Sequence, residues 1–270
     1  MKDIKLIAEI GWNHLGNMEL AKKMIESAAK NGADICKFQT WSETNLKKGA
    51  WDTDGRREIY KKAQLSEDDH YLLKDYCKKN KVDFCTSIFS IKDLGFLKKL
   101  NKKIIKIPSH EVYNIDLIKK CINNFDLVLV SLGAARWSEV QKIARLKTKK
   151  IVLMHCVSSY PLEAKNVNFY KYDQISKISS KIMGYSGHYY GYEDAMYAFV
   201  KGAKYVEKHF TINQKLPGRD NKFALNPRQF NTLSKYRDLY VEMNKVKGTN
   251  IQKCEYDIYN NYRGRWSKEK

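Results

Sequence analysis

The fold is decided by residues 4–39, which read IKLIAEIGWNHLGNMELAKKMIESAAKNGADICKFQ. The runs IKLIAEI (4–10) and ADICKFQ (33–39) have the length and apolar content of buried strands. Between them, MELAKKMIESAAKNG (18–32) has the apolar spacing of a helix and ends at Gly32. Strands joined through a helix run parallel and are buried on both faces. This stretch therefore predicts a parallel sheet covered by helices.

The same strand-helix unit recurs along the chain. Further strands are predicted at 82–88, 103–108, 126–131, 150–156, 181–186 and 203–210. Further helices are predicted at 66–80, 91–100, 114–123, 136–147, 170–180, 193–202 and 227–245, with a polar loop at 42–64. Ser66 followed by Asp69 is typical of the capped start of a helix.

Eight such units in roughly 250 residues indicate an α/β fold of the (β/α)8 TIM-barrel type. A doubly wound open sheet is the alternative, but it has fewer strands and a glycine-rich first turn. The turn here, GWNHLGN, lacks the spacing of a dinucleotide-binding turn. We predict one barrel domain at 1–248 and a basic C-terminal tail at 249–270.

Composition narrows the class of protein. The 270 residues include 50 Lys+Arg against 30 Asp+Glu, a formal net charge of +20, and the mean hydropathy is −0.60. No apolar run reaches membrane-spanning length and the six cysteines are scattered, so we expect a cytoplasmic protein without membrane contact and with reduced thiols. The charge could mark a nucleic-acid binder. Lysine pairs spread along the whole chain favour a solvated surface instead, and we expect no nucleic-acid partner.

Polar residues gather where the predicted strands end. In a parallel barrel these ends and the following loops build the active site. A single serine or histidine there can be a helix cap or a satisfied core group, but ionisable or hydroxyl groups on all eight strands are hard to explain by packing. The residues in question are Glu9, Lys37, Gln39, Thr86, Ser87, Lys106, Ser109, Glu111, Ser131, His155, Ser158, Tyr160, Ser186, His188, Glu207, Lys208 and His209.

The residue types indicate the chemistry. Lys37 and Lys106 lie inside apolar strands, where an unpaired ammonium is costly and an anionic ligand is a natural partner. Short hydroxyl donors suited to phosphate oxygens lie at Ser87, Ser109, Ser131 and Ser186. His188 and His209 end adjacent strands and could bind one divalent metal. The residues predict a barrel enzyme that acts on a phosphate-bearing anion with a metal, without naming the reaction.

The sequence resembles the catalytic barrel of the sialic acid synthase (N-acetylneuraminate synthase) family, which includes legionaminic and pseudaminic acid synthases and spore-coat polysaccharide proteins. The segments that carry the resemblance are IAEIGWNHLGNMELAKKMIESAAKNGADICKFQTW (7–41), IKIPSHEVYNIDLI (105–118), LMHCVSSYP (153–161), GYSGH (184–188) and VEKHFTINQKLPGRD (206–220).

The resemblance implies a transferase that joins phosphoenolpyruvate to the open-chain aldehyde of an N-acetylated hexosamine, releasing phosphate and forming a nine-carbon 2-keto acid for polysaccharide biosynthesis. It implies a divalent cofactor, Mn²⁺ above Mg²⁺ or Co²⁺, held by His188 and His209. It places the substrate pocket at Lys37, Ser87, Lys106, Ser109, Ser131, Ser158, Ser186 and Asp220. It gives catalytic positions around the metal water and the sugar to Glu9, Glu111, Tyr160 and Glu207.

The sequence also departs from the family pattern. Gly187 stands where Ser-Asp-His is common, and His110 stands inside the usual Ser-Gly-Glu. The family usually continues into an antifreeze-like domain that lends an arginine to the partner subunit's sugar site. We expect no such domain here, so that the usual arginine is absent or is replaced by Arg263, Arg265, a homodimer partner or a separate protein. Two alternatives stay open: a 3-deoxy-2-keto acid synthase that uses a phosphorylated aldose, and a non-catalytic barrel retained as a binding or assembly partner.

Overall fold

A computed structural model of the chain describes residues 4–266, except the side chain of Trp51. Residues 1–3 of the predicted barrel domain and 267–270 of the predicted tail lie outside the described residues. The strands are β1 Lys5–Glu9, β2 Ile35–Thr40, β3 Asp83–Ile88, β4 Ile104–Ile107, β5 Leu127–Ser131, β6 Ile151–Cys156, β7 Ile182–Gly187 and β8 Tyr205–His209. They form one closed barrel in sequence order, and every neighbouring pair is parallel. The predicted TIM barrel is confirmed.

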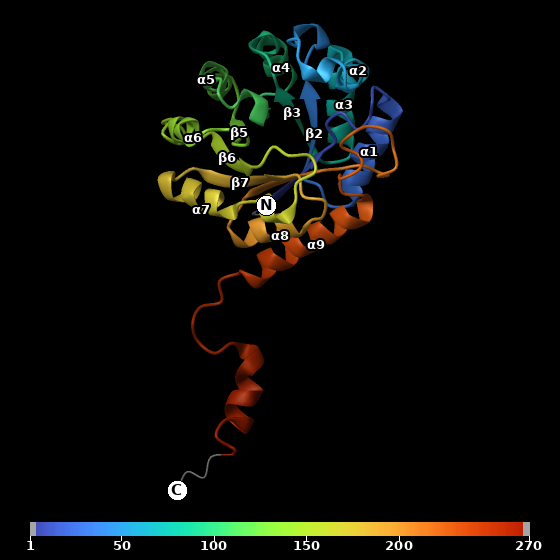
Figure 1. Cartoon of the computed structure of the whole chain (residues 1–270). Helices are drawn as coiled ribbons and strands as arrows, with labels where there is room; N and C mark the ends of the chain where they lie inside the picture. The colour runs from blue at the N-terminus through green and yellow to red at the C-terminus, as the bar shows by residue number, and fades with distance from the viewer. Residues whose placement is uncertain (1–3, 267–270) are drawn as a thin grey trace.

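Helices surround this barrel, as Figure 1 shows. They are α1 Met18–Lys30, α2 Arg56–Ala63, α3 Glu67–Lys79, α4 Leu94–Leu100, α5 Ile115–Asn124, α6 Trp137–Ala144, α7 Phe169–Ile178, α8 Glu193–Val200 and α9 Pro227–Met243. The predicted start of α3 is confirmed, since Ser66 Oγ accepts from Asp69 N and Asp69 Oδ2 accepts from Ser66 N. The other predicted ends differ from the structure by a few residues, as expected for frayed termini.

The predicted loop at 42–64 is wrong in its second half, where α2 forms. Its sequence RREIYKKA has few apolar residues, so helical periodicity was weak there. Tertiary contacts stabilise it instead. Trp41 Nε1 donates to the carbonyl of Tyr60, and the rings of Trp12 and Trp41 each meet Tyr60 edge to face at 5.1 and 5.2 Å between centroids.

Two apolar layers hold the fold together. A small cluster fills the barrel interior below the site, made by Ile7, Ile35, Cys85, Ile104, Leu129, Val152 and Met154. A much larger cluster lies between the sheet and the helices. Because side chains alternate across each strand, residues two apart share the interior face, which puts Lys37 with Gln39 and Glu207 with His209 inside the barrel.

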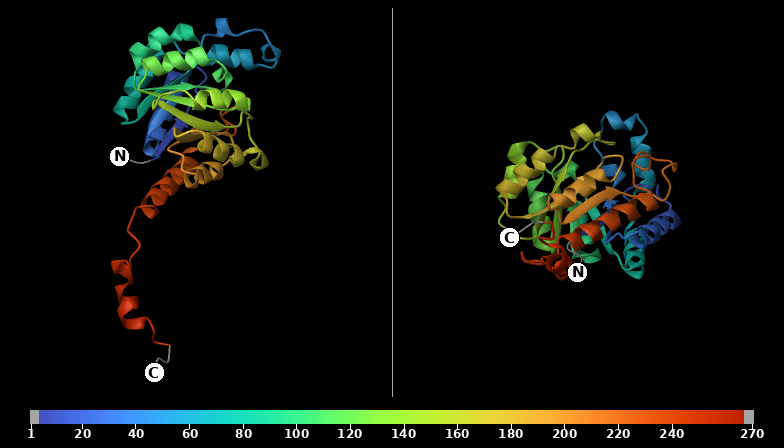
Figure 2. Two further views of the ribbon diagram at one scale, coloured as in Figure 1. Left: turned by 90° about the vertical axis from the view of Figure 1, so that its left-hand side faces the viewer. Right: turned by 90° about the horizontal axis from the view of Figure 1, so that it is seen from below.

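The chain after α9 leaves the barrel as an extended arm (Figures 1 and 2), and residues 249–266 are exposed. Arg263 lies over the ring of Tyr259, 4.7 Å from its centroid, and Arg265 lies over Tyr262. The two tail arginines therefore contact tail aromatics and do not reach the pocket of their own barrel. The division at residue 248 stays a prediction. No helix within residues 4–266 is long and apolar enough to cross a bilayer.

Candidate active site

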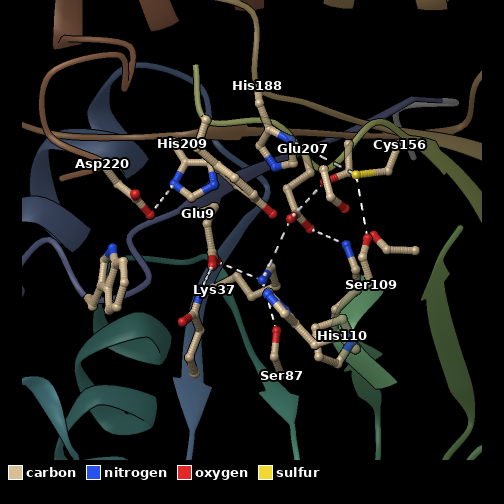
Figure 3. Close-up of a pocket in the computed structure, with 18 of the residues that line it drawn as sticks. Glu9, Lys37, Ser87, Ser109, His110, Cys156, His188, Glu207, His209 and Asp220 are labelled. Atoms are coloured by element: carbon tan, nitrogen blue, oxygen red, sulfur yellow. Dashed lines mark hydrogen bonds and ion pairs between the residues drawn. The ribbon is translucent and has the colours of Figure 1, made fainter. Parts of the chain in front are cut away.

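A cavity of about 290 Å³ opens at the carboxyl ends of the strands. Every strand contributes a lining side chain, either from its last residues or from the segment that follows (Figure 3). In a parallel barrel this is the end at which ligands bind.

The strand register brings Glu9 and Lys37 together. They are Cα partners across β1 and β2, and Lys37 Nζ lies 2.7 Å from Glu9 Oε2. The Lys37 ammonium also donates to Ser87 Oγ at 3.0 Å. Burial raises the pKa of Glu9 to about 7, with Glu207 adding to the effect and Lys37 opposing it. Glu9 can therefore hold or release a proton near neutral pH.

Glu207 is the centre of the second ion pair. Lys106 Nζ lies 2.8 Å from Glu207 Oε2, and Ser186 Oγ donates to Glu207 Oε1 at 3.1 Å. Lys37 Nζ is 3.6 Å from Oε1 of the same carboxylate. Burial alone would raise the pKa of Glu207, but Lys106 and Lys37 outweigh it and lower the pKa to about 2. The two buried lysines are thus neutralised by two carboxylates of different basicity.

Hydroxyl groups crowd the opposite wall around Gly133. A Cβ at Gly133 would lie only 2.4 Å from Ser158 Oγ and 2.6 Å from Ser109 Oγ, so only glycine leaves room for both. Ser109 Oγ contacts Cys156 Sγ at 3.6 Å, and Ser158 Oγ is buried without a hydrogen-bond partner. Buried polar atoms normally have partners, so this hydroxyl is available to a ligand.

His188 and His209 face one another across the ends of β7 and β8, with ring centroids 5.4 Å apart. His188 Nδ1 is 2.8 Å from the carbonyl oxygen of Val157. Because a carbonyl only accepts, Nδ1 carries the proton and Nε2 keeps its lone pair, the form that binds metals. His209 Nδ1 is buried without a hydrogen-bond partner, 3.4 Å from Asp220 Oδ2. Burial lowers the pKa of both imidazoles, to about 4 for His188.

Tyr160 and Asp220 lie on the outer side of the histidine pair. The Tyr160 ring is 4.0 Å from the His188 ring between centroids, and the residue is 43% exposed. Burial raises the pKa of Asp220 to about 7, although Trp12 and Arg219 oppose the shift. These side chains give the cavity mouth polar groups that can hydrogen-bond to a sugar.

Most of the predicted site residues meet in this one cavity. Thirteen of the fourteen line it: Glu9, Lys37, Ser87, Lys106, Ser109, Ser131, Ser158, Tyr160, Ser186, His188, Glu207, His209 and Asp220. Glu111 does not. Residues 109–111 form a short 3₁₀ turn in which Ser109 is buried toward the cavity, whereas Glu111 lines a neighbouring cavity of about 780 Å³ and is near Asn114. His110 lines both cavities.

Several residues that line the cavity had no predicted role. Gln39 was recognised only as a strand-end residue, and its Nε2 donates to Glu9 Oε1 at 2.5 Å. Arg56 and Arg219 also line the cavity, and both approach Asp54, at 2.6 Å and 3.8 Å. Arg219 precedes the predicted Asp220, which was a usable signal. Arg56 had none, since its helix was missed.

The departure at Gly187 has a structural reason. A Cβ at this position would lie 2.2 Å from Asp194 Oδ2 and 2.5 Å from the Tyr185 ring. The space that an aspartate side chain would occupy at position 187 is therefore filled by a carboxylate from α8.

The fold and the cavity define a TIM-barrel enzyme whose buried lysines, carboxylates and hydroxyls suit a phosphate-bearing anion. The NeuB family model matches residues 24–248, and the chain belongs to this family. It is accordingly a phosphoenolpyruvate-dependent condensing enzyme that forms a nonulosonic acid.

Three similar proteins show the range of the likeness. An N,N'-diacetyllegionaminic acid synthase of Campylobacter jejuni is 31% identical, with 94% of this chain and 80% of that protein covered. An N-acetylneuraminate-9-phosphate synthase of Drosophila melanogaster is 34% identical, with 86% and 66% covered. The crystal structure of an N-acetylneuraminic acid (sialic acid) synthetase from Leptospira borgpetersenii, in complex with citrate, matches with a TM-score of 0.85 at 27% identity, covering 98% of this chain and 93% of that one.

Proposed function

We propose that this chain condenses phosphoenolpyruvate with the open-chain form of an N-acetylated hexosamine, N-acetylmannosamine or a related 2,4-diacetamido sugar. The products are a nine-carbon 2-keto acid of the sialic, legionaminic or pseudaminic type, for surface polysaccharide biosynthesis, and phosphate. The observation that carries the proposal is the arrangement of Lys37 and Lys106, both buried and paired to carboxylates, beside a pair of buried imidazoles.

Phosphoenolpyruvate binds at the inner end of the cavity. Lys37 and Lys106 supply the positive charge there, and short hydroxyl donors surround them at Ser87, Ser109, Ser131, Ser158 and Ser186. Donors held rigidly around an anion fix its attack geometry and stabilise charge that develops during reaction. Ionised Glu9 pairs with Lys37 and so holds the ammonium in place for the incoming anion.

His188 and His209 would hold a divalent metal ion, Mn²⁺ in preference to Mg²⁺ or Co²⁺. The unpartnered His209 Nδ1 and the free Nε2 of His188 fit this role, and catalytic metal sites keep positions open for water and substrate. When bound, such an ion acts as a Lewis acid that polarises the aldehyde of the acceptor.

The acceptor lies toward the mouth. Tyr160 and Asp220 contact its hydroxyl groups. Glu111, in the neighbouring cavity, contacts the far end of a larger sugar.

The chain's residues then direct the chemistry. C3 of phosphoenolpyruvate attacks the aldehyde carbon, the former carbonyl oxygen takes a proton from solvent to become a hydroxyl, and positive charge develops at C2. Water adds at C2 and gives its proton to a carboxylate, for which Glu9 is placed by its ion pair and by Gln39. Glu207, which is ionised, stabilises the positive charge and keeps Lys106 in position. The adduct expels phosphate by cleavage of the C2–O bond, the phosphate takes the proton of the C2 hydroxyl, and the ketone remains.

The acceptor is tested by phosphate release with phosphoenolpyruvate, Mn²⁺ and a panel of N-acetylated hexosamines, followed by mass analysis of the product. The proposal expects release that depends on an acceptor, and a product that carries the three pyruvate carbons. Release with none of the sugars by a folded protein would contradict it.

A phosphorylated acceptor is the second candidate. Two guanidinium groups, those of Arg56 and Arg219, line the mouth of the cavity, and guanidinium groups suit a phosphate on the acceptor. The 6-phosphate of N-acetylmannosamine therefore belongs in the panel. A phosphorylated aldose without the N-acetyl group tests the 3-deoxy-2-keto acid alternative in the same assay.

A further inference from the structure

A buried ion pair lies behind the barrel wall, outside the cavity. Lys208 lies in β8 between Glu207 and His209, so its side chain points to the opposite face of the strand. Its Nζ is 2.9 Å from both carboxylate oxygens of Asp194, in the first turn of α8, and both side chains are 2% exposed. Tyr185 in β7 donates its hydroxyl to Asp194 Oδ2 at 2.9 Å.

The same ammonium contacts the segments that carry both imidazoles. Lys208 Nζ donates to the carbonyl oxygen of Tyr189, the residue directly after His188, at 2.8 Å. Lys208 itself directly precedes His209. The Lys208 side chain therefore connects the segment that carries His188 to the segment that carries His209. Asp194 holds the ammonium of Lys208 in place.

Gly187 shows how closely the carboxylate is seated. Gly187 and Lys208 are Cα partners across β7 and β8. The Asp194 carboxylate fills the space where a side chain at 187 would begin, 2.2 Å from the position of a Cβ. The backbone of Gly187 is not left-handed, so the glycine is required by space and not by conformation.

We propose that Asp194 is a positioning residue: by holding Lys208 it fixes His188 relative to His209 and so sets the affinity of this pair for a divalent metal. The inference rests on the metal assignment in the proposed function. Groups behind the ligands of a metal orient the imidazoles, and losing one costs roughly 10–100-fold in affinity. Without Asp194, Lys208 is a buried unpaired cation, and it relaxes away from Tyr189 toward water.

The test measures Mn²⁺ affinity by titration of free Mn²⁺ with electron paramagnetic resonance. We expect Asp194→Ala to bind Mn²⁺ at least about tenfold more weakly than the parent. Asp173→Ala is the matched control, because it removes a 2.7 Å pair with Lys201 that touches neither histidine segment.

Loss of Asp194 alone can prevent folding, so a second variant replaces the whole pair. Asp194→Leu/Lys208→Met removes both charges, which is often tolerated in a buried site, and also removes the contact to Tyr189. We expect it to fold and to bind Mn²⁺ weakly. Parent affinity in either folded variant would overturn this inference and leave the metal assignment standing. A parent protein that binds no Mn²⁺ would overturn the metal assignment, and this inference with it.

Discussion

Glu9 is the residue whose environment says most about the chemistry. Its pKa is raised to about 7 by burial, while Lys37 and Gln39 hold both of its oxygens. If Glu9 takes the proton of the attacking water, it must be ionised, so kcat/KM falls as pH drops below about 7. We expect Glu9→Gln to lose roughly 10²–10⁴-fold in kcat, the usual contribution of a general base. Steady-state rates across pH 5.5–8.5 check this, and turnover within tenfold of the parent would exclude the role.

Arg219 lies at the end of the cavity where we expect the acceptor to bind. The residue lines the mouth, and its side chain is 52% exposed, so solvent weakens its interaction with a ligand. We expect Arg219→Gln to raise KM for the acceptor about fivefold, with kcat and KM for phosphoenolpyruvate nearly unchanged. Arg228→Gln, on the exposed side of α9, is the control. Acceptor KM values within twofold of each other in parent and variant would remove Arg219 from the site.

Helix α9 is anchored to the barrel by one buried arginine. Arg237 is fully buried, and its guanidinium donates to Asp34 Oδ2 at 2.6 Å, to the carbonyl of Gly32, and to Ser234 Oγ. It thereby ties α9 to the turn between α1 and β2. Removing one partner of a buried pair costs about 3–5 kcal/mol.

We therefore expect Arg237→Ala to lower the free energy of unfolding in urea by about 3–5 kcal/mol. Arg228→Ala on the same helix should stay within about 0.5 kcal/mol of the parent. Equal free energies of unfolding for the two variants would show that the contacts of Arg237 do not stabilise the fold.

The elements also show where sequence reasoning succeeds. Strand ends could be predicted because apolar runs of fixed length alternate with amphipathic helices, and the geometry of a barrel then gathers those ends. Helix α2 could not, because Tyr60 is fixed by Trp12 and Trp41 from elsewhere in the chain. Glu111 lies in the neighbouring cavity because the 3₁₀ turn at 109–111 directs it away from Ser109, which the sequence pattern does not indicate. The pairing of Asp194 with Lys208 depends on a contact between helix and sheet that has no local sequence signal.

For the whole molecule, buried histidines link stability to pH. Burial lowers the pKa of His155 to about 4, and its Nε2 contacts the carbonyl of Val167 at 2.8 Å. Because this folded-state pKa lies below the unfolded value, His155 costs stability as pH falls from about 6.5 to about 4. Glu9 and Asp220 have raised pKa values and act in the opposite direction, so the parent curve alone does not isolate the histidine.

The comparison with His155→Phe does isolate it. Between pH 7 and pH 5 we expect the parent to lose about 2 kcal/mol relative to this variant, the linkage value for a shift of this size. Urea titrations of both proteins at the two pH values give the difference in free energy of unfolding between parent and variant at each pH. A difference that does not change with pH would mean that the pKa of His155 is the same in the folded and the unfolded protein.

The central claim for the whole molecule is that one cavity at the carboxyl end of the barrel brings the metal and phosphoenolpyruvate together. Diffraction from crystals soaked with Mn²⁺ and phosphoenolpyruvate, recorded at the manganese edge, tests it most directly. We expect one anomalous peak about 2.0–2.3 Å from a nitrogen of His188 and of His209, with phosphoenolpyruvate against Lys37 and Lys106. A peak at other residues, or phosphoenolpyruvate bound outside this cavity, would contradict it.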